Sequence, residues 1–163
     1  MVELTHWRDV VVFQRNPTGC IATGFEWLIR YAKIGGVDLG SFQEDFDLQR
    51  SGKGMNDFGS VTGKIKERYP HLSIVIKDFP NGREKVEFVK LLVGEDTPCL
   101  LSIANTPIGV SWHIVPVVLV DDTKVKVLWN GDQTQEFTIE DLIYRHNNWI
   151  GGKDIAWTRR SQS

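Results

Sequence analysis

A cysteine and a histidine stand in this chain where together they could attack an acyl carbon. Cys20 follows the turn-forming residues 16–19 and begins an apolar helical pattern, so we expect it in the first turn of a helix. The backbone N–H groups of that turn have no partner within the helix and favour a thiolate over a thiol. His113 begins the most strand-like segment of the chain and is the candidate base, which takes up a proton and returns it to the leaving group.

Two carboxamides supply the remaining parts of such a site. A side chain that accepts a hydrogen bond from the second imidazole nitrogen fixes the ring, and Asn130 is the candidate, with Asp132 as the alternative. Because Asn130 precedes a glycine, and Asn-Gly is also a common turn signal, a purely structural role stays open. The negatively charged oxygen of the intermediate needs donors, for which we expect the backbone N–H of Cys20 and the side chain of Gln14.

Helices are expected mainly in the first half of the chain and strands mainly in the second. The predicted helices cover residues 20–34, 42–49, 60–69 and 83–93, with a further capping segment at 138–141. The predicted strands cover residues 72–76, 99–104, 112–120, 124–130, 134–137 and 155–157. Ser41 is the expected cap of the second helix. This order predicts an α+β fold in which a helical half packs against an antiparallel sheet.

A short polar connection between two predicted strands sets the register that carries the histidine. If residues 121–124 form the turn of a hairpin, Val120 pairs with Val125. The paired residues share one face of the sheet, and side chains alternate along each strand.

This register places the candidate groups relative to one another. Asn130 then lies opposite Val115, and Asp132 lies opposite His113, so all four side chains point the same way. Trp129 would point to the other face. A slip of one residue would reverse this arrangement.

Length and composition indicate one globular domain. The chain has 163 residues, of which 41% are hydrophobic and 25% charged, so we expect a single domain over 1–163 with residues 158–163 frayed. A net charge of −2 argues against binding to nucleic acid or to an anionic membrane. No long apolar run or signal peptide is visible, which favours a cytoplasmic protein with reduced thiols. Nothing in the sequence indicates an oligomeric state.

The other histidines and the second cysteine show no pattern that indicates chemistry. His6, His71 and His146 lack the spacing of metal ligands, so neither a metal nor another cofactor is expected. Cys99 lies between Pro98 and Leu100 on a predicted strand, which is typical of a packing residue.

The order of these segments resembles the papain-like cysteine peptidases. The similar segments are Gln14 followed by Cys20 at a helix start, Pro-Cys-Leu-Leu-Ser-Ile at 98–103, Trp-His-Ile-Val-Pro-Val-Val at 112–118 and Val-Lys-Val-Leu-Trp-Asn at 125–130. Within that superfamily the compact length is most similar to the bacteriocin-processing (double-glycine) leader peptidases. Two departures stand out: Ile21 follows the cysteine where these enzymes commonly have glycine, and Asn130 precedes glycine where they usually have aspartate before proline.

The resemblance implies a papain-like fold and a role for each matching residue. Cys20 would be the nucleophile, His113 the base and acid, Asn130 the residue that orients the imidazole, and Gln14 an oxyanion donor.

We therefore expect a cysteine hydrolase that cleaves amide bonds of a peptide or protein substrate through a thioester. Trp112 and Gly19 would line the substrate groove. The alternatives are a protein deamidase or acyl transferase with the same residues, and a binding module that keeps the fold without turnover.

Overall fold

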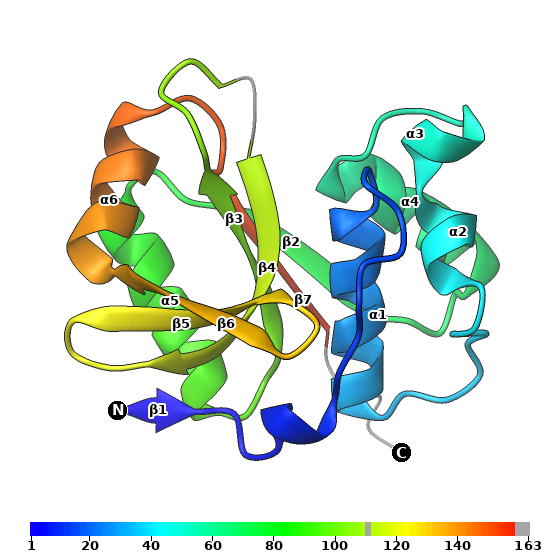
Figure 1. Cartoon of the computed structure of the whole chain (residues 1–163), viewed down its shortest axis with the longest axis horizontal. Coiled ribbons are helices and arrows are strands. Elements are labelled where there is room, and N and C mark those ends of the chain that lie inside the picture. The colour runs from blue at the N-terminus through cyan, green and yellow to red at the C-terminus, as the bar shows by residue number, and fades with distance from the viewer. Residues whose placement is uncertain (110–111, 159–163) are drawn as a thin grey trace.

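The computed structural model describes residues 1–109 and 112–158, which form a helical half and a sheet half side by side (Figure 1). The helices are η1 (Trp7–Asp9), α1 (Cys20–Ala32), α2 (Phe42–Phe46), α3 (Leu48–Ser51), α4 (Phe58–Arg68), α5 (Gly82–Gly94) and α6 (Ile139–Asn148). The strands are β1 (Val2–Glu3), β2 (Ile74–Asp78), β3 (Cys99–Ala104), β4 (Trp112–Val120), β5 (Lys124–Asn130), β6 (Gln133–Thr138) and β7 (Asp154–Thr158). No helix within these described ranges is long and apolar enough to cross a bilayer.

The strands join in one antiparallel sheet. In the described part of the chain their order is β2-β7-β3-β4-β5-β6, and β1 pairs with β4 beside this path. Helices α1 to α4 lie on one side of the sheet, and α5 and α6 lie on the other (Figure 1). The predicted α+β fold, a helical half packed on an antiparallel sheet, is confirmed.

Helix α1 is buried on most of its circumference, as its sequence predicts. Phe25 and Leu28 are fully buried and Trp27 is 2% exposed. A Cβ at Gly24 would lie 2.9 Å from the side chain of Leu100 in β3, so glycine lets the helix approach the sheet closely. This close contact fixes the start of α1 next to the middle strands.

The predicted helix over 42–49 is two short helices instead of one. Asp47 separates α2 from α3 and caps α3 by accepting a hydrogen bond from the backbone N–H of Arg50. Ser41 makes no side-chain cap bond to α2, so the cap predicted there is wrong. The cap predicted at Thr138 is confirmed, since its hydroxyl accepts the backbone N–H of Asp141 at 3.0 Å.

The end of the described chain is ordered further than predicted. Thr158 pairs with Ile74, is 1% exposed, and donates its hydroxyl proton to the carbonyl of Ser73 at 2.8 Å. The prediction that fraying begins at 158 is therefore wrong, because this residue completes β7 and its hydroxyl finds a backbone acceptor. Residues 159–163 lie outside the described part of the chain.

The hairpin of β4 and β5 begins in the predicted register and then departs from it. Val120 pairs with Val125 as expected, but a shift between Val117 and Leu119 brings Val117 opposite Val127. β4 has one extra residue at this point. Beyond it, by this register, the β5 side chains that were predicted to share a face with His113 lie on the other face.

The pairs predicted beyond the shift are consequently wrong. If the register continues from Val117 opposite Val127, Val115 falls opposite Trp129 and not opposite Asn130, which pairs with Gln133 of β6 on its other side. Asp132 is exposed in the turn between β5 and β6.

Candidate active site

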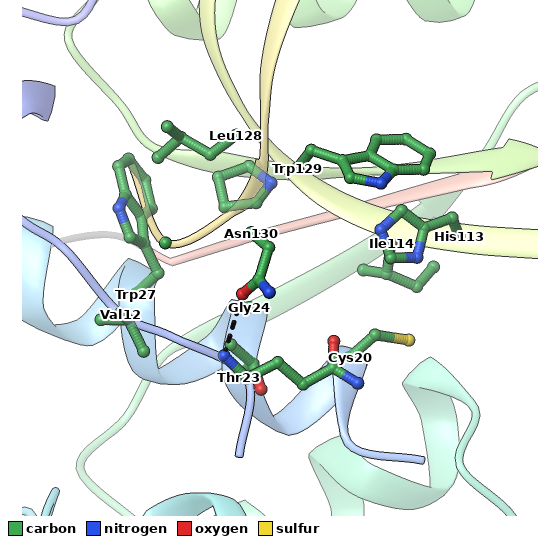
Figure 2. A pocket seen from close by; sticks show the side chains of 13 residues that line it. Val12, Cys20, Thr23, Gly24, Trp27, His113, Ile114, Leu128, Trp129 and Asn130 are labelled. Atoms are coloured by element: carbon green, nitrogen blue, oxygen red, sulfur yellow. Dashed lines mark hydrogen bonds between the residues drawn. The ribbon is translucent and has the colours of Figure 1, made fainter. Parts of the chain in front are cut away.

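Four of the residues predicted for the site line one narrow pocket between the two halves. Gln14 comes from the segment before α1. Cys20 comes from α1, His113 from β4 and Asn130 from β5 (Figure 2). We call this cavity of about 30 Å³ the Cys20 pocket. The fold therefore brings together residues that are up to 116 positions apart.

The other predicted residues lie elsewhere. Gly19 precedes α1 as its N-cap residue, and Trp112 lines a neighbouring cavity. Asp132 is not part of the Cys20 pocket, so its predicted place as an alternative to Asn130 has no support in the fold.

Cys20 is half-buried at the first position of α1. In Figure 2 its side chain extends from the helix start toward the side of the pocket where His113 and Ile114 lie. Burial raises the pKa of the thiol, while the backbone N–H groups of Ile114, Ile21 and Cys20 itself lower it and the charge of Asp47 raises it further. The N–H groups act as predicted, but burial outweighs them, so the free protein holds a thiol and not a thiolate.

A buried carboxylate holds the turn in front of Cys20. Asp47 is fully buried and accepts hydrogen bonds from the Thr18 hydroxyl at 2.6 Å and the Asn56 amide at 2.7 Å. Asn56 also donates to the carbonyl of Thr18 at 2.7 Å. Neither Asp47 nor Asn56 was expected here from the sequence, in which Asp47 falls inside the predicted helix over 42–49.

His113 presents one free ring nitrogen. Its imidazole is hydrogen-bonded to the backbone of Trp129, which raises the pKa of the ring, but burial has the larger effect and lowers it. Nε2 is buried and has no hydrogen-bond partner. Because Nε2 has no partner, we assign the bond to Trp129, and with it the proton of the neutral ring, to Nδ1, which leaves a lone pair on Nε2.

Trp129 packs against His113, although the predicted register placed the two side chains on different faces of the sheet. The ring centroids of His113 and Trp129 are 4.3 Å apart. The shift between Val117 and Leu119 explains this difference, since it reverses the relation between the two strands. The imidazole is thus held by the ring and the backbone of the same residue.

Asn130 is hydrogen-bonded to Gln14, whereas the hydrogen bond of the imidazole, among the described residues, is to Trp129. The side-chain oxygen of Asn130 accepts the backbone N–H of Gln14 at 3.2 Å, the dashed line in Figure 2. The Gln14 amide donates to the carbonyls of Asn16 at 2.7 Å and Pro17 at 3.2 Å. Asn130 therefore fixes the segment that carries Gln14.

That segment closes one side of the Cys20 pocket. Gly131 has a φ of 63°, and any Cβ there would overlap the ring of Phe13. The carbonyl of Phe13 accepts from Gln43 at 2.8 Å, and the carbonyl of Val10 accepts from the indole of Trp27 at 3.1 Å. Residues 10–14 are thus bound to the helical half and touch the sheet half at the tip of β5.

Solved structures share this arrangement of elements, although no protein-family model and no curated protein matches the sequence. A Bacillus anthracis protein, described as a C39-like peptidase, superposes with a TM-score of 0.59 at 15% identity and covers 99% of this chain and 98% of its own. A double-glycine motif protease from an AMS/PCAT transporter, solved in complex with the leader peptide, gives 0.60 at 14% identity, with 92% and 91% covered. The chain therefore has the papain-like α+β fold of these peptidases.

Proposed function

We propose that the protein is a cysteine peptidase in which Cys20 attacks the peptide carbonyl and His113 transfers the protons. The observation that carries this proposal is the Cys20 pocket, which holds both side chains and leaves Nε2 of His113 unpartnered. The fold shared with peptidases supports it.

The charge states of the free site favour proton transfer during attack. The thiol pKa is raised and the imidazole pKa is lowered, so both groups are neutral near pH 7. As Sγ of Cys20 bonds to the carbonyl carbon, the thiol proton passes to Nε2 and the carbonyl oxygen becomes an oxyanion.

The remaining steps return the protein to its starting state. The imidazolium of His113 gives its proton to the leaving nitrogen, the C–N bond breaks and a thioester remains. Water then loses a proton to Nε2 and attacks the thioester carbon. The acid product leaves, and the sulfur recovers its proton from His113.

We propose that the Trp129 carbonyl orients the His113 ring. It would also stabilise the imidazolium that forms when the thiol attacks and again when water attacks. Asn130, predicted for this role, becomes a positioning residue that holds Gln14.

The oxyanion would be stabilised by the backbone N–H of Cys20 and by the Gln14 amide, as predicted. For this the amide must exchange its longer bond, at 3.2 Å to Pro17, for a bond to the substrate. Loss of one such donor lowers the rate by roughly 10²-fold or more, so we expect Gln14→Ala to lower kcat by that factor.

A library of unstructured peptides, followed by mass spectrometry, tests the proposal. A peptidase yields pairs of fragments whose masses sum to the parent plus one water. A gain of about one mass unit without cleavage would instead show a deamidase, and an unchanged library would indicate a binding module. A peptide chloromethyl ketone provides the direct test of the nucleophile: it should form a thioether on Cys20, and labelling should be lost in Cys20→Ala.

A further inference from the structure

A larger cavity adjoins the Cys20 pocket. It measures about 230 Å³, shares Ile114 with the Cys20 pocket, and includes Ile21, the residue after Cys20. We call it the Trp112 pocket, because the indole of Trp112, 41% exposed, forms one wall. Phe58 at the start of α4 lines it from the helical half.

The floor of the Trp112 pocket is a row of side chains across four neighbouring strands. Ile114 of β4 pairs with Ser102 of β3, and Asp154 of β7 pairs with Asp78 of β2. The register of β3 and β7 continues to Ser102 and Asp154, whose side chains are hydrogen-bonded. These residues share the face of Leu100, which meets Gly24 of α1, so the row faces the helical half.

The row becomes acidic with distance from Cys20. Burial raises the pKa of Asp154, and the like charge of Asp78, directly opposite on β2, raises it further. Asp57, the N-cap of α4, adds a third carboxylate to the lining, although it also accepts bonds from Ser60.

Two lysines lie near this acidic end: Lys153 lines the pocket itself, and the charge of Lys85 partly offsets the rise in the pKa of Asp154. Both ammonium groups are bonded to backbone carbonyls. The Lys153 ammonium donates to the carbonyls of His146 and Trp149, and the Lys85 ammonium, behind the floor, donates to those of Ser102 and Gly152. Among the described residues the three carboxylates form no salt bridge.

We propose that the Trp112 pocket is a specificity subsite that binds a lysine or arginine side chain of the substrate. The apolar walls would cover the aliphatic stem, and Asp154, Asp78 and Asp57 would receive the cationic end. This inference rests on the proposed peptidase function and adds the side chain that the substrate must carry.

The spacing of the strands limits where that residue lies. Asp154 is two strands from Ile114, or roughly 10 Å at about 4.8 Å per strand. An extended peptide covers about 3.3 Å per residue. The basic residue is therefore expected within three positions of the bond that Cys20 attacks, on one side only.

Matched peptide substrates test this preference. A peptide that the protein cleaves is made with arginine, lysine, norleucine or glutamate at each of the three positions on either side of the scissile bond. We expect kcat/KM to be about tenfold higher or more for arginine and lysine than for norleucine at one position.

Two variants locate the preference in the pocket. Asp154→Asn should abolish it, and Asp78→Lys, at an exposed position, should abolish it and favour glutamate. Asp122→Asn, an exposed carboxylate in the β4–β5 turn, is the matched control and should keep it. Thermal unfolding of each variant checks folding; if Asp154→Asn fails to fold, Asp78→Lys decides.

The possible outcomes separate the two proposals. Equal cleavage of arginine and norleucine peptides, or a basic preference that survives both variants, overturns the subsite and leaves the peptidase intact. An absence of cleavage, with no chloromethyl ketone adduct on Cys20, overturns the peptidase and the subsite with it.

Discussion

Two histidines that line different cavities have similar surroundings and different neighbours. His113 bonds to the backbone of Trp129 and leaves Nε2 unpartnered; His146 of α6 contacts the carbonyl of Phe79 at 2.9 Å and leaves Nδ1 unpartnered. Burial lowers the pKa of both rings. By these criteria alone either one could be a catalytic base.

The spaces around the two rings distinguish them. His113 shares the Cys20 pocket with a thiol, and that pocket adjoins the Trp112 pocket. His146 lines a cavity of about 10 Å³ behind the sheet with Lys85, which is 4% exposed and has its pKa lowered to about 7 by burial. We call it the Lys85 cavity. A perturbed pKa therefore indicates only that a group is buried. A candidate active site also needs a nucleophile in the same cavity and space for a substrate.

Replacing each of the two cysteines separately should give the largest difference in activity. Cys20→Ala should lower kcat by about 10⁴-fold or more, since it removes the attacking atom. Cys99 is fully buried in β3, and Cys99→Ala should change kcat less than about twofold while costing about 1 kcal/mol of unfolding free energy. Peptide cleavage and urea unfolding measure both; comparable loss of activity in the two variants would contradict the assignment.

Replacing His113 and His146 separately should give the second largest difference in activity. His113→Ala should lower kcat by about 10³-fold, because no other group takes the thiol proton. His146→Ala should leave kcat within a few-fold and lower the unfolding free energy by about 1–3 kcal/mol, because the buried ring and its bond to Phe79 are lost. If His146→Ala folds normally and loses catalysis, the distinction between the two cavities fails.

Lys85 should make stability depend on pH. Below pH 7 the lysine is protonated in both states, so its burial penalty is fully present. Above pH 7 the folded state releases the proton that the unfolded state keeps up to about pH 10.5, so stability rises by up to about 1.4 kcal/mol per pH unit. Relative to Lys85→Met, the wild type should gain about 2–3 kcal/mol between pH 7 and 9. The unfolding free energy of both proteins is measured in urea at several pH values. The same pH dependence in wild type and Lys85→Met would disprove the assigned role of Lys85.

The smallest effect concerns the free thiol of Cys20. Because its pKa is raised, alkylation by iodoacetamide should accelerate by roughly tenfold per pH unit from pH 6 to 8 without a plateau. Mass spectrometry of the peptide that contains Cys20 gives the rate, with Cys99 as the protected reference. A plateau below pH 7 would show a thiolate paired with imidazolium and would replace the neutral mechanism.

Periodicity and turn signals predicted most of the elements, though not β1, η1 or the break between α2 and α3, and Cys20 and His113 line one pocket. The turn at 16–19 and the apolar pattern after it located the start of α1, and the polar connection 121–124 located the hairpin. These signals are local, so one sequence contains them.

The partners of the side chains were not predictable in the same way. The shift near Val117 leaves no mark in the residue types, and the group that holds the imidazole is the backbone of Trp129, which every residue type shares. Burial of Lys85 and Asp47 depends on long-range packing.

The segment 10–14 is attached unequally to the two halves. It holds to the helical half through the bonds of Val10 and Phe13, and to the sheet half through the bond between Gln14 and Asn130 and the contact of Phe13 with Gly131. One exposed hydrogen bond contributes only about 1 kcal/mol. Separation of the segment from the tip of β5 would therefore break one exposed hydrogen bond and one contact of Phe13, while the bonds of Val10 and Phe13 would keep it on the helical half.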